Sequence, residues 1–131
     1  MIAADANIFL RWLLDDDKPK AERITTLFKR AQEGKVEIRT TDLTIAEVVW
    51  VLGSYYEMKP PAVADMLEPL LDSPIQFENR ARLLVAMELF RIHKASFGDC
   101  YLAAFAREQT AEAVLSYDRD FNALGAKRVE P

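Results

Sequence analysis

Apolar residues recur along this chain with two different periods, which predicts short strands that alternate with helices. Strands are expected at residues 2–4, 36–40, 75–77, 113–116 and 127–129. Helices are expected around apolar stripes at residues 8–13, 24–31, 45–52, 61–71, 80–93, 97–105 and 119–124. Because parallel strands need long crossover connections, this alternation favours an α/β fold with a parallel sheet covered by helices.

Glycine, proline and acidic residues mark where several of these helices begin and end. Gly34 and Gly125 follow apolar stripes and suit left-handed helix ends. The run Asp15 to Asp17 precedes Pro19, so we interpret it as solvated helix capping and not as a ligand set. Within the helix over residues 80–93, the side chains expected to face the core are Leu83, Leu84, Ala86, Met87 and Phe90.

The composition fits one domain over residues 1–131, because half of the residues are apolar. No run of eighteen apolar residues occurs, so we expect neither a signal peptide nor a membrane span. The single cysteine, Cys100, excludes an internal disulfide and a zinc-binding cysteine set, which fits a cytoplasmic location. The single histidine, His93, leaves little scope for a serine or cysteine nucleophile.

Four acids, Asp5, Glu47, Asp99 and Asp118, fall where a predicted strand ends or a predicted helix begins. In an open α/β sheet such positions gather at the carboxyl edge of the strands, where ligands bind. Two carboxylates about 4 Å apart repel by roughly 1 kcal/mol in water and about 4 kcal/mol at an effective dielectric of about 20. A divalent cation with oxygen ligands relieves that repulsion, so the pattern indicates a Mg²⁺ or Mn²⁺ site that activates water.

Helix capping offers a purely structural explanation for each acid. Thr44 to Glu47 has the spacing of a capping box, which by itself would make Glu47 a helix cap. The joint pattern favours a site, because all four positions are acids and because Asn7 and Ser116 stand two residues from Asp5 and Asp118 as supporting polar groups. The net charge of −4 argues only against broad duplex binding, since bound cations would reverse the local charge.

Several short motifs, taken together, resemble a known family over the whole length of the chain. They are Asp5-Ala6-Asn7 after a strand, Arg11 with Asp15-Asp16, Glu47 on the third helix, Asp99 followed by Ala103-Ala104, and Ser116-x-Asp118-x-Asp120-Phe121. This combination resembles the PIN-domain nucleases and, more narrowly, the VapC toxins of toxin–antitoxin pairs. The departures are mild: Ala6 stands where the family often has Thr or Ser, and Ser116 where it often has Thr.

The resemblance implies a three-layer α/β/α domain with about five parallel strands in the order 3-2-1-4-5 and about seven helices. It implies a Mg²⁺- or Mn²⁺-dependent endoribonuclease that cuts structured RNA, such as tRNA or a ribosomal RNA loop. Asp5, Asp99 and Asp118 would then hold the metal, and Glu47 would orient or deprotonate the attacking water. A VapB-like antitoxin and a homodimer are the implied protein partners.

Three other interpretations remain open. A PIN fold that binds without cutting RNA would keep the architecture, although four intact acids count against it. A phosphoacceptor receiver domain has a similar length, but it needs paired acids after the first strand, where this chain has only Asp5. A haloacid-dehalogenase phosphatase would need an aspartate at the place of Asn7.

Overall fold

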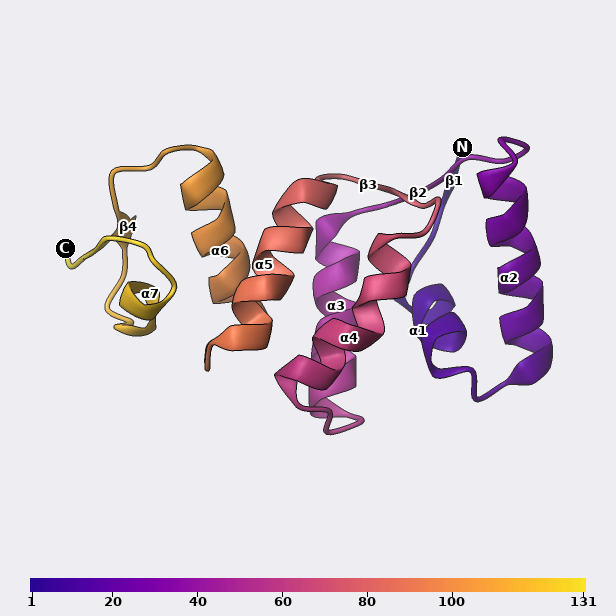
Figure 1. The fold of residues 1–131 in the computed structure, drawn as a ribbon, viewed down its shortest axis with the longest axis horizontal. Coiled ribbons are helices and arrows are strands. Elements are labelled where there is room, and N and C mark those ends of the chain that lie inside the picture. The colour runs from indigo at the N-terminus through magenta and orange to yellow at the C-terminus, as the bar shows by residue number, and fades with distance from the viewer. The chain divides into compact units, whose positions relative to one another are not determined.

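The computed structural model describes residues 1–131 as two compact units, Met1–Arg80 and Ala81–Pro131. Each unit is described here by itself. Both combine helices with short parallel strands (Figure 1).

The first unit holds a three-stranded parallel sheet in the order β1-β2-β3. Ile2 lies opposite Ile38, and Thr40 lies opposite Phe77. Helices α1, α3 and α4 contact one another, and α1 also contacts α2. The elements are β1 (Ile2–Ala3), α1 (Ala6–Leu14), α2 (Lys18–Gln32), β2 (Ile38–Thr40), α3 (Asp42–Ser54), α4 (Pro60–Leu71) and β3 (Gln76–Phe77).

The second unit pairs two parallel strands, with Val114 opposite Arg128. Its core combines small residues of one helix with larger apolar side chains from the C-terminal segment. The buried core residues are Leu89, Cys100, Ala103, Ala106, Val114, Phe121 and Leu124. The elements are α5 (Arg80–Ile92), whose first residue closes the first unit, α6 (Phe97–Glu108), β4 (Val114–Leu115), α7 (Asp120–Ala123) and β5 (Arg128–Val129).

The α/β fold class is confirmed, with seven helices and only parallel strand pairs. Both observed strand orders agree with the expected order 3-2-1-4-5. The order β1-β2-β3, read backwards, is its first part, and β4-β5 is its last part. None of the helices is both long and apolar enough to cross a lipid bilayer.

Local signals placed most helix ends correctly. Asp17 caps α2, because its carboxylate accepts a hydrogen bond of 3.2 Å from the backbone N–H of Lys20. This bond to the charged form lowers the pKa of Asp17. Gly34 and Gly125 follow helix ends with φ values of +74° and +78°, which glycine adopts without steric cost.

The expected inward face of α5 needs correction. Leu83, Ala86 and Met87 are buried as expected, but Leu84 is 46% exposed because it falls to the side of that stripe. On α6, small residues form most of the buried face, and Phe105 is 41% exposed with the guanidinium of Arg82 over its ring at 5.0 Å.

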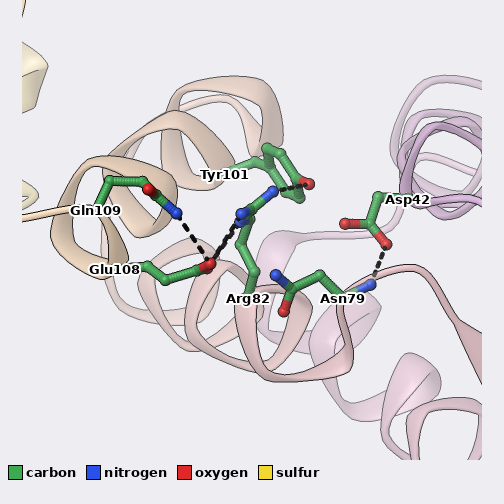
Figure 2. A network of polar contacts seen from close by, with 6 residues as sticks. All are labelled: Asp42, Asn79, Arg82, Tyr101, Glu108 and Gln109. Atoms are coloured by element: carbon green, nitrogen blue, oxygen red, sulfur yellow. Dashed lines mark hydrogen bonds and ion pairs between the residues drawn. The ribbon is translucent and has the colours of Figure 1, made fainter.

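Arg82 joins α5 to α6 within the second unit. Its guanidinium donates two hydrogen bonds of 2.9 Å to the carboxylate of Glu108 and one of 3.0 Å to the hydroxyl of Tyr101 (Figure 2). The Tyr101 and Phe105 rings also lie beneath this cation. These contacts raise the pKa of Arg82, first through the bond to Glu108, so the side chain stays charged.

Arg80 has a comparable role in the first unit. Its guanidinium donates hydrogen bonds to the backbone carbonyls of Leu71, Ser73 and Ile75, the last two at 3.0 and 2.8 Å. It also lies 5.0 Å from the centre of the Phe77 ring. One side chain therefore satisfies the carbonyl groups where the chain leaves α4 and enters β3.

We expect Arg80→Met to lower the free energy of unfolding by about 2–4 kcal/mol, because three carbonyl groups lose a charged donor. Urea unfolding followed by circular dichroism measures this loss. Arg30→Met is the matched control, since Arg30 is exposed and its side chain has no partner, and it should change stability by less than about 0.5 kcal/mol. Equal stability of the two variants would show that the Arg80 contacts contribute nothing.

Candidate active site

Asp5 lies between the end of β1 and the start of α1. Two hydrogen bonds hold the backbone of the preceding residue, Ala4. Its N–H donates to the carbonyl of Arg39 at 2.9 Å, and its carbonyl accepts from the hydroxyl of Thr40 at 3.0 Å. Asp5 is the N-cap of α1, because its Oδ1 accepts from the N–H of Ile8 at 3.2 Å. Its side chain is exposed, and Oδ2 makes no hydrogen bond.

Glu47 is not a helix cap, so the capping-box interpretation of Thr44 to Glu47 is wrong. Helix α3 begins earlier than expected, with Thr41 as its N-cap and the N–H of Thr44 bonded to the Thr41 hydroxyl at 3.1 Å. Glu47 consequently lies in the second turn of α3. Its carboxylate is exposed and has no hydrogen-bond or ion-pair partner.

Asp99 occupies the first turn of α6, as expected. Its N–H donates to the hydroxyl of Ser96, the N-cap residue, at 3.1 Å, and its carboxylate accepts no hydrogen bond. The neighbouring Cys100 is fully buried, and burial, followed by the negative charge of Asp99, raises the pKa of its thiol to about 11. Cys100 is therefore a core residue and not a nucleophile.

Asp118 and Ser116 form a small hydrogen-bonded turn after β4. The N–H of Asp118 donates to the hydroxyl of Ser116 at 2.9 Å, and Oδ1 of Asp118 accepts from the N–H of Asp120 at 2.9 Å. Ser116 thus holds the backbone of Asp118. Asn7, the other polar neighbour expected to support an acid, is exposed at the start of α1, and its side chain makes no hydrogen bond.

The two units carry two acids each. Asp5 and Glu47 belong to the first unit, and Asp99 and Asp118 belong to the second. Within either unit, no three Asp, Glu, His or Cys side chains form a group that could hold a metal ion. A joint site of all four acids therefore stays a prediction.

The donor set nevertheless fits a hard divalent cation. Asp5 and Asp118 each use one carboxylate oxygen for a backbone N–H and keep the other available. The carboxylates of Glu47 and Asp99 are entirely available. Mg²⁺ and Mn²⁺ prefer such oxygen ligands, so all four residues could contribute to a metal centre.

Sequence reasoning missed the polar contacts at the carboxyl ends of β2 and β3. Asp42 is 6% exposed, its N–H donates to Glu78 at 2.9 Å, and its Oδ1 accepts from the N–H of Asn79 at 3.2 Å (Figure 2). The Thr41-Asp42 pair before the apolar stripe of α3 was a usable helix-start signal. Nothing in the sequence indicated that Asp42 would bond 37 residues away.

Comparisons with known proteins agree with this architecture. The family model for the PIN domain matches residues 2–127, across both units. The chain is also similar to a VapC ribonuclease of Aquifex aeolicus (strain VF5), with 24% identity over 128 residues that cover 97% of this chain and 94% of the relative. No solved structure matches the chain. Since the family model spans nearly the whole sequence, the chain belongs to the PIN domain family.

Proposed function

We propose that this protein is a metal-dependent endoribonuclease that hydrolyses phosphodiester bonds in structured RNA, such as a tRNA or a ribosomal RNA loop. We further propose that it acts as the toxin of a toxin–antitoxin pair. Membership of the PIN family and the similarity to a VapC ribonuclease support both statements.

The observation that carries the catalytic proposal is the state of the four carboxylates. Asp5, Glu47, Asp99 and Asp118 each retain at least one oxygen that no protein group occupies. The backbone bonds at Asp5 and Asp118 use one oxygen of each carboxylate, so they leave the other oxygen for a metal ion. Glu47 is the strongest case, since it has no structural partner at all.

The chain's residues would divide the reaction between them. Asp5, Asp99 and Asp118 would hold the cation, and Glu47 would accept a proton from the attacking water. When bound, Mg²⁺ or Mn²⁺ would supply the charge that lowers the pKa of water and offsets charge on the phosphate. Ser116 would keep Asp118 in place through its hydrogen bond to the Asp118 N–H, and Asn7 would support the site beside Asp5.

The proposed protein partners are a VapB-like antitoxin and a second copy of this chain. The first unit exposes aromatic side chains that could serve such an interface: Trp50 is 66% exposed and Tyr55 is 77% exposed. Tyr55 packs edge-on against Tyr56, with ring centres 4.9 Å apart. Trp12 is less suited, because it is partly buried against Phe28 at 5.0 Å.

We expect the purified protein to cut total bacterial RNA into discrete fragments with Mg²⁺ or Mn²⁺ and not with EDTA. Asp99→Asn and Glu47→Gln should each lower the cleavage rate by more than roughly 100-fold, because each removes a carboxylate charge from the centre. Gel analysis of the fragments measures the rate, and mapping their ends identifies the RNA. Equal cleavage by the parent and by identically purified Asp99→Asn would indicate a contaminating ribonuclease.

Measurements of unfolding free energy distinguish a catalytic role from a helix-capping role at Glu47 and Asp5. Glu47→Gln should alter the free energy of unfolding by less than about 0.5 kcal/mol, since its side chain is exposed and unbonded. Asp5→Asn should keep the cap of α1, whereas Asp5→Ala should lose about 1 kcal/mol. If Glu47→Gln unfolded the protein, the proposed catalytic role of Glu47 would lose its support.

We also expect Mg²⁺ or Mn²⁺ to raise the melting temperature of the parent protein. A cation that binds only the folded state adds about 2.7 kcal/mol at a concentration of roughly one hundred times its dissociation constant. Asp99→Asn should show a smaller rise, because one proposed ligand has lost its charge. Differential scanning fluorimetry over a cation series measures both, and the same rise in both proteins would remove Asp99 from the ligand set.

A further inference from the structure

Thr40 is a buried polar residue at the end of β2, which lies beside β1 (Figure 1). Thr40 is 7% exposed, and Asp42 is the only other polar residue buried to this degree. Burying a hydroxyl lowers stability unless the hydroxyl has a hydrogen-bond partner. Valine has a similar branched shape, suits a strand equally well and carries no such cost. The hydroxyl of Thr40 therefore calls for a specific partner.

The partner is the peptide group that joins Ala4 to Asp5. The two strands pair Ala3 with Arg39, so the same register places Thr40 opposite Ala4. The Thr40 Oγ1 donates to the Ala4 carbonyl oxygen at 3.0 Å. That oxygen and the backbone nitrogen of Asp5 belong to one planar peptide group, so a bond to the oxygen restrains both atoms. The hydroxyl of Thr40 thereby restrains the backbone from which the Asp5 side chain projects.

Two further hydrogen bonds act on the same short segment. The N–H of Ala4 donates to the Arg39 carbonyl at 2.9 Å, which fixes the peptide group before Ala4. After Asp5, the N–H of Ile8 donates to Oδ1 of the Asp5 carboxylate at 3.2 Å. All of these residues belong to the first unit. Of the three bonds, the one from Thr40 is the bond that a side-chain substitution removes without changing Asp5 itself.

We propose that Thr40 is a positioning residue for the proposed metal ligand Asp5. The inference rests on the proposed function, in which Asp5 holds a divalent cation, and it names a second residue that sets the affinity for that cation. Mg²⁺ demands its oxygen ligands in nearly ideal octahedral positions. A ligand whose backbone is already restrained loses less conformational freedom when the cation binds. Thr40 acts only through the peptide group at Asp5 and is not itself a ligand.

Binding of Mn²⁺ to the full-length, metal-free protein tests the proposal. Thr40→Val removes the hydroxyl and keeps the branched shape. It should raise the dissociation constant for Mn²⁺ about tenfold, the lower end of the loss that follows when a residue supporting a metal ligand is replaced. Thr40→Ser retains the hydroxyl and should bind Mn²⁺ as the wild-type chain does. Electron paramagnetic resonance of the free Mn²⁺ measures these constants.

RNA cleavage gives a second measurement that a general loss of stability does not reproduce. Thr40→Val should need about tenfold more Mn²⁺ for half-maximal cleavage. Saturating Mn²⁺ should restore most of the wild-type rate, since the proposed ligands themselves are intact. Thr26→Val is the matched control, because the Thr26 hydroxyl also donates to a backbone carbonyl at 3.0 Å, that of Glu22 within α2. It should leave the Mn²⁺ dependence unchanged.

Circular dichroism verifies that each variant is folded at the assay temperature. If Thr40→Val fails to fold, Thr40→Ser and Thr40→Ala form a second matched pair. Both lose the methyl group, and only the alanine variant also loses the hydroxyl. The difference of about tenfold in the Mn²⁺ dissociation constant is then expected between these two variants.

Amide hydrogen exchange at Ile8 provides a measurement that needs no metal. The Ile8 N–H is bonded to the Asp5 carboxylate, so its protection reports whether Asp5 keeps its place. In Thr40→Val the Ile8 amide should exchange about fivefold faster, the factor that corresponds to one hydrogen bond of ordinary net strength. Thr40→Ser and Thr26→Val should show the wild-type exchange rate. Nuclear magnetic resonance of the labelled protein measures this rate.

The outcomes separate this inference from the proposed function. If the wild-type chain binds Mn²⁺ and cleaves RNA but Thr40→Val and Thr26→Val behave alike, the positioning role is refuted and the nuclease stands. If the wild-type chain neither binds Mn²⁺ nor cleaves RNA, the nuclease proposal fails, and exchange at Ile8 decides the role of Thr40. Faster exchange in Thr40→Val alone supports its hold on Asp5, and equal exchange in all variants overturns it.

Discussion

Parallel strand pairing is the constraint on which the rest of this structure depends. A parallel strand cannot return through a tight turn, so helices must connect the strands, and all strand ends of one sheet lie at the same edge. In the first unit this edge collects Asp5 after β1, Thr40 and Asp42 at the end of β2, and Glu78 after β3. Polar backbone groups of one strand end are satisfied there by side chains of the next.

Capping and metal binding are compatible roles for the acids of this protein. A carboxylate has two oxygens, and a backbone N–H uses only one of them at Asp5, the N-cap of α1, and at Asp118, in the turn before α7. The backbone bond fixes the side chain in one orientation and leaves the second oxygen free for another ligand. A cap therefore lowers the entropy cost of holding a ligand in place.

The arginines divide into those that hold the fold and those that remain available. Arg80 bonds to three backbone carbonyls, and Arg82 bonds to a carboxylate and a phenol. The planar guanidinium group suits such multidentate contacts. Arg23 is exposed and has no such partner.

The sequence by itself determined the fold class, the order of helices and strands, and most helix ends. It could do so because burial periodicity and end signals such as Asp17 and Gly34 act over a few neighbouring residues. It also singled out four acids whose oxygens the structure leaves available. Tertiary structure alone decided that Glu47 is no cap and that Asp42 bonds to Asn79. The first outcome depends on α3 beginning after Thr41, and the second depends on a contact between distant segments. Local sequence patterns do not encode either of them.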